Sequence, residues 1–129
     1  MRIAKQDLPI TMNVPGATAH HLPDFGVAAA ALAGEYLSLD AGVDIAPLLV
    51  GLEGDRCQAA HWGYLVDGVV VVTYADGSSD RCTSGDVFHW PAGHSVRVEE
   101  QAEIVMFSPA AEHRAVIDHM LARIATLPA

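Results

Sequence analysis

The stretch from residue 64 to residue 109 constrains the fold most, because it reads as short β-strands separated by tight turns. Residues 69–74 are all β-branched or aromatic, which favours a strand. The ADGS at residues 75–78 and the PAG at residues 91–93 are turn signals, and such signals recur about every eight to twelve residues. This spacing is typical of a β-sandwich or a β-barrel.

The end of the chain changes from strand to helix periodicity. Ser108 is a candidate N-cap, and Pro109 suits the first helical position. A set of apolar side chains then falls on one helical face. These are Val116, Ile117, Met120, Leu121 and Ile124. Residues 109–127 are therefore predicted to form an amphipathic helix that packs on the β-domain or on a partner subunit.

The length of 129 residues suits one domain that buries its own core. Residues 1–34 are broken by prolines and glycines and are predicted to be an irregular N-terminal arm. From residue 35 the chain reads as β, because EYLSL alternates apolar and polar side chains. The barrel is therefore predicted to span residues 35–108.

The chain carries 16 acidic and 7 basic residues, a net charge of −9. Such a surface repels phosphate backbones and anionic lipids, so neither nucleic acid nor a membrane is an expected partner. No segment is apolar for long enough to span a bilayer, and the first residues lack the pattern of a signal peptide. We therefore expect a cytoplasmic protein with Cys57 and Cys82 reduced, although a disulfide between them is also open.

Two segments carry a resemblance to a known family. GDVFHWPAG at residues 85–93 matches the first part of the second cupin motif, and YLVDG at residues 64–68 resembles the end of the first. From about residue 35 to residue 109 the chain thus resembles the cupin superfamily. CQAAHWGY at residues 57–64 is also similar to a sequence motif found in small single-domain bacterial cupins. The resemblance implies an all-β double-stranded barrel (jelly roll), here with a C-terminal helix, and a homodimer paired through edge strands.

The residues at the usual cupin metal positions depart from the family pattern, which uses two histidines, a glutamate and a third histidine. Counting back from Gly68 puts Asp55, Cys57 and His61 at the first three positions. Val96 stands at the fourth. The resemblance therefore implies where a metal would lie, but it does not carry the usual ligand set over to this chain.

Cys57, His61 and His94 are the predicted metal ligands. Cys57 and His61 would share one face of an extended strand, about 13 Å apart unless the strand bends. His94 alternates with Val96 and Val98 on the apolar face, so it is expected to point inward. Thiolate and imidazole suit Zn²⁺ best and are compatible with Fe²⁺, Ni²⁺ or Cu, and three protein ligands leave one coordination position open.

The predicted substrate pocket consists of Trp90, His89, Tyr64 and Asp55. Asp55 and His89 are also candidates for a fourth metal ligand. Other histidines are expected to be solvated, in a loop or on the C-terminal helix. These are His20, His21, His113 and His119.

Two functions are compatible with this pattern. One is a metal-dependent enzyme that acts on a small organic molecule, which the three predicted ligands favour. The other is a non-catalytic sensor or binding protein that holds a small-molecule ligand without metal. In that case Cys57 packs as a small apolar residue and the histidines hydrogen-bond within the pocket.

Overall fold

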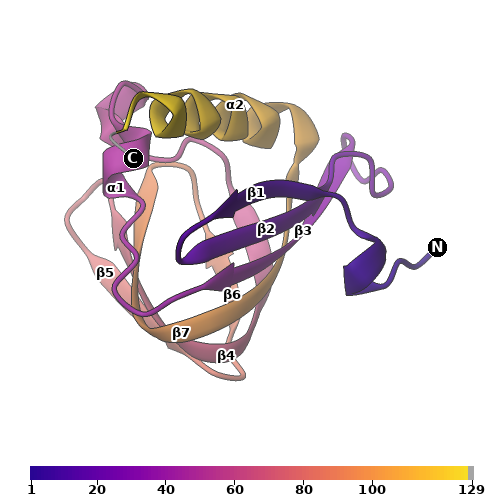
Figure 1. Ribbon diagram of the computed structural model, residues 1–129, viewed down its shortest axis with the longest axis horizontal. Helices are drawn as coiled ribbons and strands as arrows, with labels where there is room; N and C mark the ends of the chain where they lie inside the picture. Colours follow the sequence, from indigo (N-terminus) through magenta and orange to yellow (C-terminus); the bar gives the residue numbers. More distant parts are fainter. Residues whose placement is uncertain (128–129) are drawn as a thin grey trace.

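The computed structural model describes residues 1–127, in which seven antiparallel strands form one strongly curled sheet (Figure 1). A 17-residue helix, α2, lies across one end of this sheet. The elements in chain order are η1 (Lys5–Asp7), β1 (Ile10–Val14), β2 (Ala17–Leu22), β3 (Leu32–Leu39), α1 (Ala46–Leu49), η2 (Glu53–Asp55), β4 (His61–Tyr74), β5 (Ser79–Thr83), β6 (Val87–Trp90), β7 (His94–Pro109) and α2 (Ala110–Thr126).

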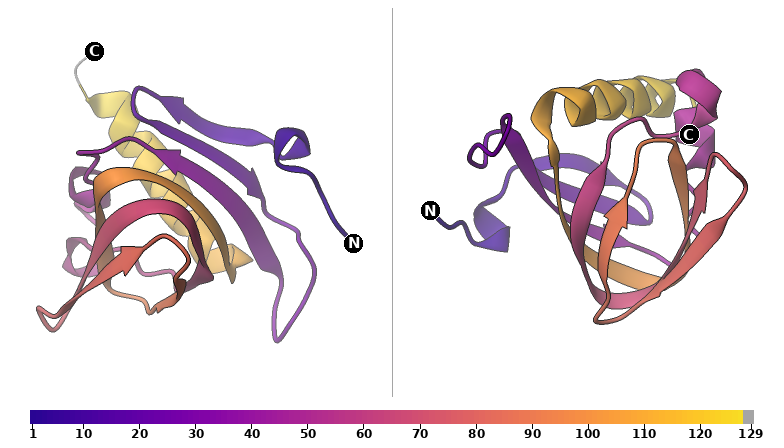
Figure 2. Two further views of the ribbon diagram at one scale, coloured as in Figure 1. Left: turned by 90° about the horizontal axis from the view of Figure 1, so that it is seen from below. Right: turned by 180° about the vertical axis from the view of Figure 1, so that it is seen from behind.

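The two longest strands, β4 and β7, form the centre of the sheet. The strand order is β1-β2-β3-β7-β4-β5, and β6 pairs with β4 beyond this path. The β4–β7 register shifts three times between Leu65 and Val70, and such irregularities increase the bend and twist of a strand. The sheet therefore curls around an interior, as the barrel prediction required (Figure 2).

Gly68 lies at this bend and has to be glycine. Its φ is +100°, and a Cβ built there would come within 2.1 Å of the carbonyl oxygen of Gln101 on β7. Only a residue without a side chain permits both that backbone conformation and so close an approach of the two strands.

The core follows the alternation of the strands. Side chains of β4 and β7 that point inward are buried, and a smaller cluster of Leu49, Cys57, Ala59 and Val116 joins the loop before β4 to helix α2. The main core consists of Leu39, Leu65, Val70, Val72, Cys82, Phe88, Trp90, Val96, Val98, Ala102, Ile104 and Met106. Both cysteines are free and buried.

The prediction of an irregular arm over residues 1–34 is wrong. β1 and β2 form a hairpin there, and β2 pairs with β3 in continuous register. Pro9 precedes β1, while Pro15 and Gly16 form the turn between the two strands. The residues that suggested an irregular arm are therefore the ends and turns of strands.

The predicted C-terminal helix is confirmed within one residue at each end. Val116, Ile117, Met120 and Ile124 face the interior, whereas Leu121 is 37% exposed. Ser108 does not cap the helix, because its hydroxyl lies against His61 inside the barrel. Within residues 1–127, no helix combines the length and the apolar character that crossing a membrane requires.

Candidate functional site

A cavity of about 570 Å³ lies between the inner face of the sheet and helices α1 and α2. Its walls are mostly aliphatic, and polar side chains gather where β3, β4, β7 and α2 approach one another. Those side chains are Glu35, Cys57, His61, His94 and His113. Cavities of this size hold small molecules, and a few convergent polar groups in an apolar wall are typical of binding sites.

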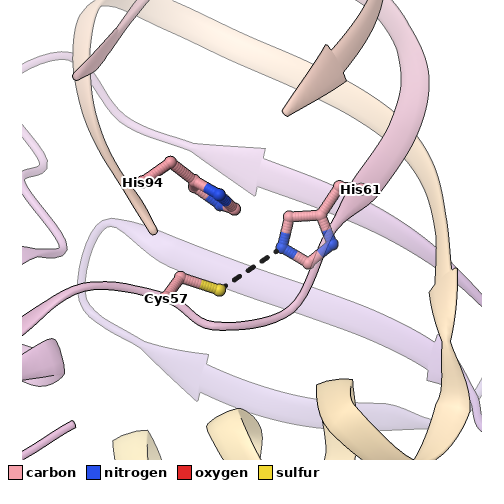
Figure 3. Close-up of side chains that lie close together, drawn as sticks. All are labelled: Cys57, His61 and His94. Atoms are coloured by element: carbon pink, nitrogen blue, oxygen red, sulfur yellow. Dashed lines mark hydrogen bonds between the residues drawn. The ribbon is translucent and has the colours of Figure 1, made fainter. Parts of the chain in front are cut away.

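Cys57, His61 and His94 converge at this cavity, as predicted (Figure 3). Their donor atoms lie within 4.8 Å of one another, and all three residues are buried. Cys57 Sγ is 3.6 Å from His61 Nε2. The predicted separation of about 13 Å is wrong, because Cys57 lies in the loop before β4 rather than on the strand.

Backbone hydrogen bonds hold that loop against the start of β7. The Cys57 amide donates to the carbonyl oxygen of His94 at 2.8 Å, and the Gly93 amide donates to the carbonyl oxygen of Cys57 at 2.7 Å. His61 begins β4 and His94 begins β7. Three separate chain segments thus fix the three side chains, so their convergence does not depend on one flexible loop.

The hydrogen bonds of the two rings determine which nitrogens remain free. His94 Nδ1 donates to the carbonyl oxygen of Pro91 at 2.7 Å, because a carbonyl can only accept. His61 Nδ1 lies 2.5 Å from the hydroxyl of Ser108, and its Nε2 lies 3.6 Å from Cys57 Sγ, whose thiol donates to the carbonyl oxygen of Ala59 at 3.6 Å. Nε2 of His94 therefore carries the lone pair, as a metal ligand requires, and Nε2 of His61 faces the Cys57 thiol.

Burial keeps all three groups neutral. It lowers the pKa of His61 well below the ordinary 6.5, and the neighbouring His113 and His94 lower it further. Burial also lowers the pKa of His94, although the hydrogen bond to Pro91 opposes this. It raises the pKa of the Cys57 thiol to about 11. The site therefore offers two neutral imidazoles and a thiol whose proton a bound cation would have to displace.

Of the predicted pocket residues, only Trp90 lines the cavity. The predictions for His89, Tyr64 and Asp55 are wrong. Strand alternation turns His89 outward, where it stacks on Trp62, and it leaves Tyr64 44% exposed. Asp55 belongs to η2, where its carboxylate accepts a hydrogen bond from a backbone amide. None of these three can supply a ligand to the cluster in this arrangement.

A second buried group, His21, Glu35 and His113, was not foreseen from the sequence. His21 was expected in a solvated loop and His113 on the helix surface, and both expectations are wrong. His113 Nε2 lies 3.0 Å from a carboxylate oxygen of Glu35. The signal for His113 was present, since it precedes Val116 and Met120 at helical spacing on the apolar face. His20 is half-buried and His119 bonds to the carbonyl oxygen of Val50.

The architecture is similar to that of solved structures, among them a cupin. No known family model matches the sequence, and no curated protein matches it. A cupin of the RmlC-like type from Shewanella frigidimarina is 20% identical, with a TM-score of 0.59 over 87% of this chain and 93% of that one. The polyketide cyclase RemF of Streptomyces resistomycificus is 16% identical, with a TM-score of 0.59 over 85% and 79%.

An oxalate decarboxylase of Bacillus subtilis with Mn(II) centres is 21% identical, with a TM-score of 0.56 over 83% of this chain. The present chain spans 28% of that enzyme and 32% of the oxalate decarboxylase of Lactobacillus farciminis. The fold is therefore the cupin fold, as the two sequence motifs implied. At these identities the likeness establishes the architecture alone, so the function has to be argued from the cavity and its side chains.

The neutral buried histidines predict that the chelator-treated protein loses stability in mild acid. Below pH 6.5 the unfolded chain protonates His61 and His94 more readily than the folded chain does, because burial lowers the pKa of both in the folded chain. The free energy of unfolding therefore falls as the pH is lowered. Each histidine contributes up to about 1.4 kcal/mol per pH unit. Urea unfolding between pH 7.5 and pH 5 measures this slope, which His61→Gln should flatten. His20→Gln is the control, and equal slopes in both variants would contradict the assignment.

Proposed function

We propose that Cys57, His61 and His94 bind a divalent transition metal and that the cavity above them holds a small organic molecule. The observation that carries the proposal is the convergence of three buried donor atoms within 4.8 Å of one another at the wall of a cavity. Side chains with a purely structural role would not need to line a cavity. The predicted metal site thus stays a hypothesis, now with a defined geometry in its support.

The donor set fits a transition metal. One thiolate and two imidazole nitrogens favour Zn²⁺, with Fe²⁺, Ni²⁺ or Cu as alternatives. The related oxalate decarboxylase has Mn(II) centres, but Mn²⁺ prefers oxygen ligands and is the poorer match for a thiolate. The partners of the rings also fit, because Ser108 and the Pro91 carbonyl orient His61 and His94 with Nε2 toward the cluster.

Such a metal would supply Lewis acidity at an open coordination position. The chain's own residues would do the rest. Ser108 orients the ring of His61, the Pro91 carbonyl fixes the tautomer of His94, and the aliphatic walls bind the apolar part of the substrate and exclude water. Glu35 and His113 line the same cavity and add polar groups to its wall. We therefore place the reaction among metal-assisted conversions of a small organic molecule.

Metal content tests this proposal. Protein purified without chelator is expected to hold zinc or iron, and Cys57→Ser or His94→Gln should lower its content by one equivalent. Cys82→Ser is the matched control, since Cys82 is also free and buried but lies outside the cluster. Elemental analysis of all four proteins, with circular dichroism to verify folding, provides the measurement. Equal metal content in every folded variant would refute the site.

A metal-free binding protein is the second candidate, and the size and apolar character of the cavity favour it. In this case His61, His94 and Cys57 form a neutral hydrogen-bonded cluster that recognises the polar end of a ligand. The apolar walls would hold the ligand's body and contribute about 0.8 kcal/mol for each methylene group they bury.

Thermal stability tests this candidate with a series of straight-chain alcohols on chelator-treated protein. The melting temperature should rise with chain length until the cavity is full. Ala19→Leu should reduce the rise, because Ala19 lines the cavity, whereas Thr18→Leu on the opposite face of β2 should not. A melting temperature that no alcohol raises would count against a metal-free binding protein.

We also propose that the protein is a cytoplasmic homodimer without nucleic-acid or membrane partners. The net charge of −9 and the two free cysteines support the location and the absence of such partners. The dimer is supported by a row of exposed apolar side chains on the outer face of the sheet, where register places neighbouring members side by side. The row comprises Trp62, Tyr64, Val66, Val87 and Phe107.

Sedimentation equilibrium measures the dimer directly. The wild-type protein should have twice the mass of one chain, and Tyr64→Glu should shift it toward the monomer because a buried unpaired charge disfavours association. Val27→Glu, in an exposed loop, is the control. A wild-type protein that sediments as a monomer at every concentration would refute this arrangement.

A further inference from the structure

A second group of buried polar side chains lies at the inner face of the sheet, outside the cluster of Cys57, His61 and His94. His21 on β2 stands directly opposite Glu35 on β3 in the strand register. Because directly paired residues point to the same face, both side chains project inward. His113 on helix α2 contacts both of them. Its Nε2 lies 3.0 Å from Glu35 Oε1, and its ring centroid lies 5.4 Å from that of His21.

We propose that His21, Glu35 and His113 form a second divalent-metal site, separate from the one at Cys57. One donor atom from each residue lies within 4.8 Å of the other two. The three residues are 4–6% exposed and belong to three different elements, so tertiary structure alone brings them together. Two histidines and one carboxylate are a ligand set for Zn²⁺ or Fe²⁺ that leaves coordination positions open.

The hydrogen bonding of this group is incomplete without a cation. Within residues 1–127, His21 Nε2 and His113 Nδ1 are buried and have no hydrogen-bond partner. Unpaired buried nitrogens are rare in folded proteins and call for an explanation. Glu35 is the buried carboxylate of the same region, and its ion-pair partner His113 is charged only when protonated. A divalent cation would neutralise the carboxylate and give His21 Nε2 a partner.

The two sites would adjoin without sharing a ligand. The ring of His61 lies between them, with its centroid 5.0 Å from those of both His94 and His113. Both Glu35 and His113 line the same cavity as the Cys57 cluster. A molecule in the cavity would therefore meet one thiolate-containing site and one carboxylate-containing site along the same wall.

Zinc binding to the full-length protein tests the inference. After chelator treatment, equilibrium dialysis against Zn²⁺ should give two equivalents for the wild type and one for His21→Gln or Glu35→Gln. His20→Gln is the matched control, because it changes the neighbouring histidine of the same strand. Folding of each variant is verified by circular dichroism and by its melting temperature. If Glu35→Gln does not fold, His21→Gln decides.

The outcomes separate this inference from the proposed function. Loss of one equivalent in His21→Gln but none in Cys57→Ser leaves the second site standing and refutes the first. Loss in Cys57→Ser with wild-type binding in folded His21→Gln and Glu35→Gln refutes the second site, and Glu35 and His113 are then a structural ion pair. Wild-type protein that binds no zinc refutes both sites. Cobalt(II) gives a second readout, since only the Cys57 site should show thiolate-to-metal absorption.

Discussion

The pairing of β4 with β7, bent at Gly68, is the constraint on which the rest of the structure depends. If the two strands kept a continuous register, they would form a flatter ribbon with both faces in water. The register shifts near Gly68, together with the approach of the Gln101 carbonyl, curl them instead. The curl turns alternate side chains of every strand toward one interior. It also brings the first residue of β4, His61, close to the first residue of β7, His94.

An interior made this way is apolar, and that determines the chemistry of the groups inside it. Removal from water disfavours charge, so burial lowers the pKa of His61 and His94 and raises that of the Cys57 thiol. Neutral imidazoles have free lone pairs, which suits ligand binding, but a protonated thiol is a poor nucleophile and a poor ligand. A cation is what would convert the cluster from a neutral hydrogen-bonded group into a charged one. The same fold therefore permits both a metal-dependent enzyme and a metal-free binding protein.

Much of the architecture could be predicted from local pattern. Alternation and turn residues over residues 64–109 predicted a β-sandwich or a β-barrel, the resemblance to cupins favoured the barrel, and periodicity predicted the helix. The cluster of Cys57, His61 and His94 was also foreseen, although its metal binding stays a prediction. The errors came from interactions that local pattern does not contain. Pro15 and Gly16 looked like a break and are a hairpin turn, and His21 looked solvated because its partner Glu35 is 14 positions away and His113 is far along the chain.

The charged side chains of the cavity wall bear on which ligands the cavity can bind. Among the residues that the structure describes, no lysine or arginine lines the cavity, whereas the carboxylates of Glu35 and Asp44 do. An anionic ligand would therefore find no lysine or arginine in a largely apolar cavity, which disfavours an unpaired charge. A metal at the Cys57 cluster would reverse that balance by supplying positive charge at the polar end of the cavity. An anionic ligand would thus favour the metal-dependent function and a neutral ligand the metal-free one, so the charge of the molecule that binds helps to distinguish the two functions.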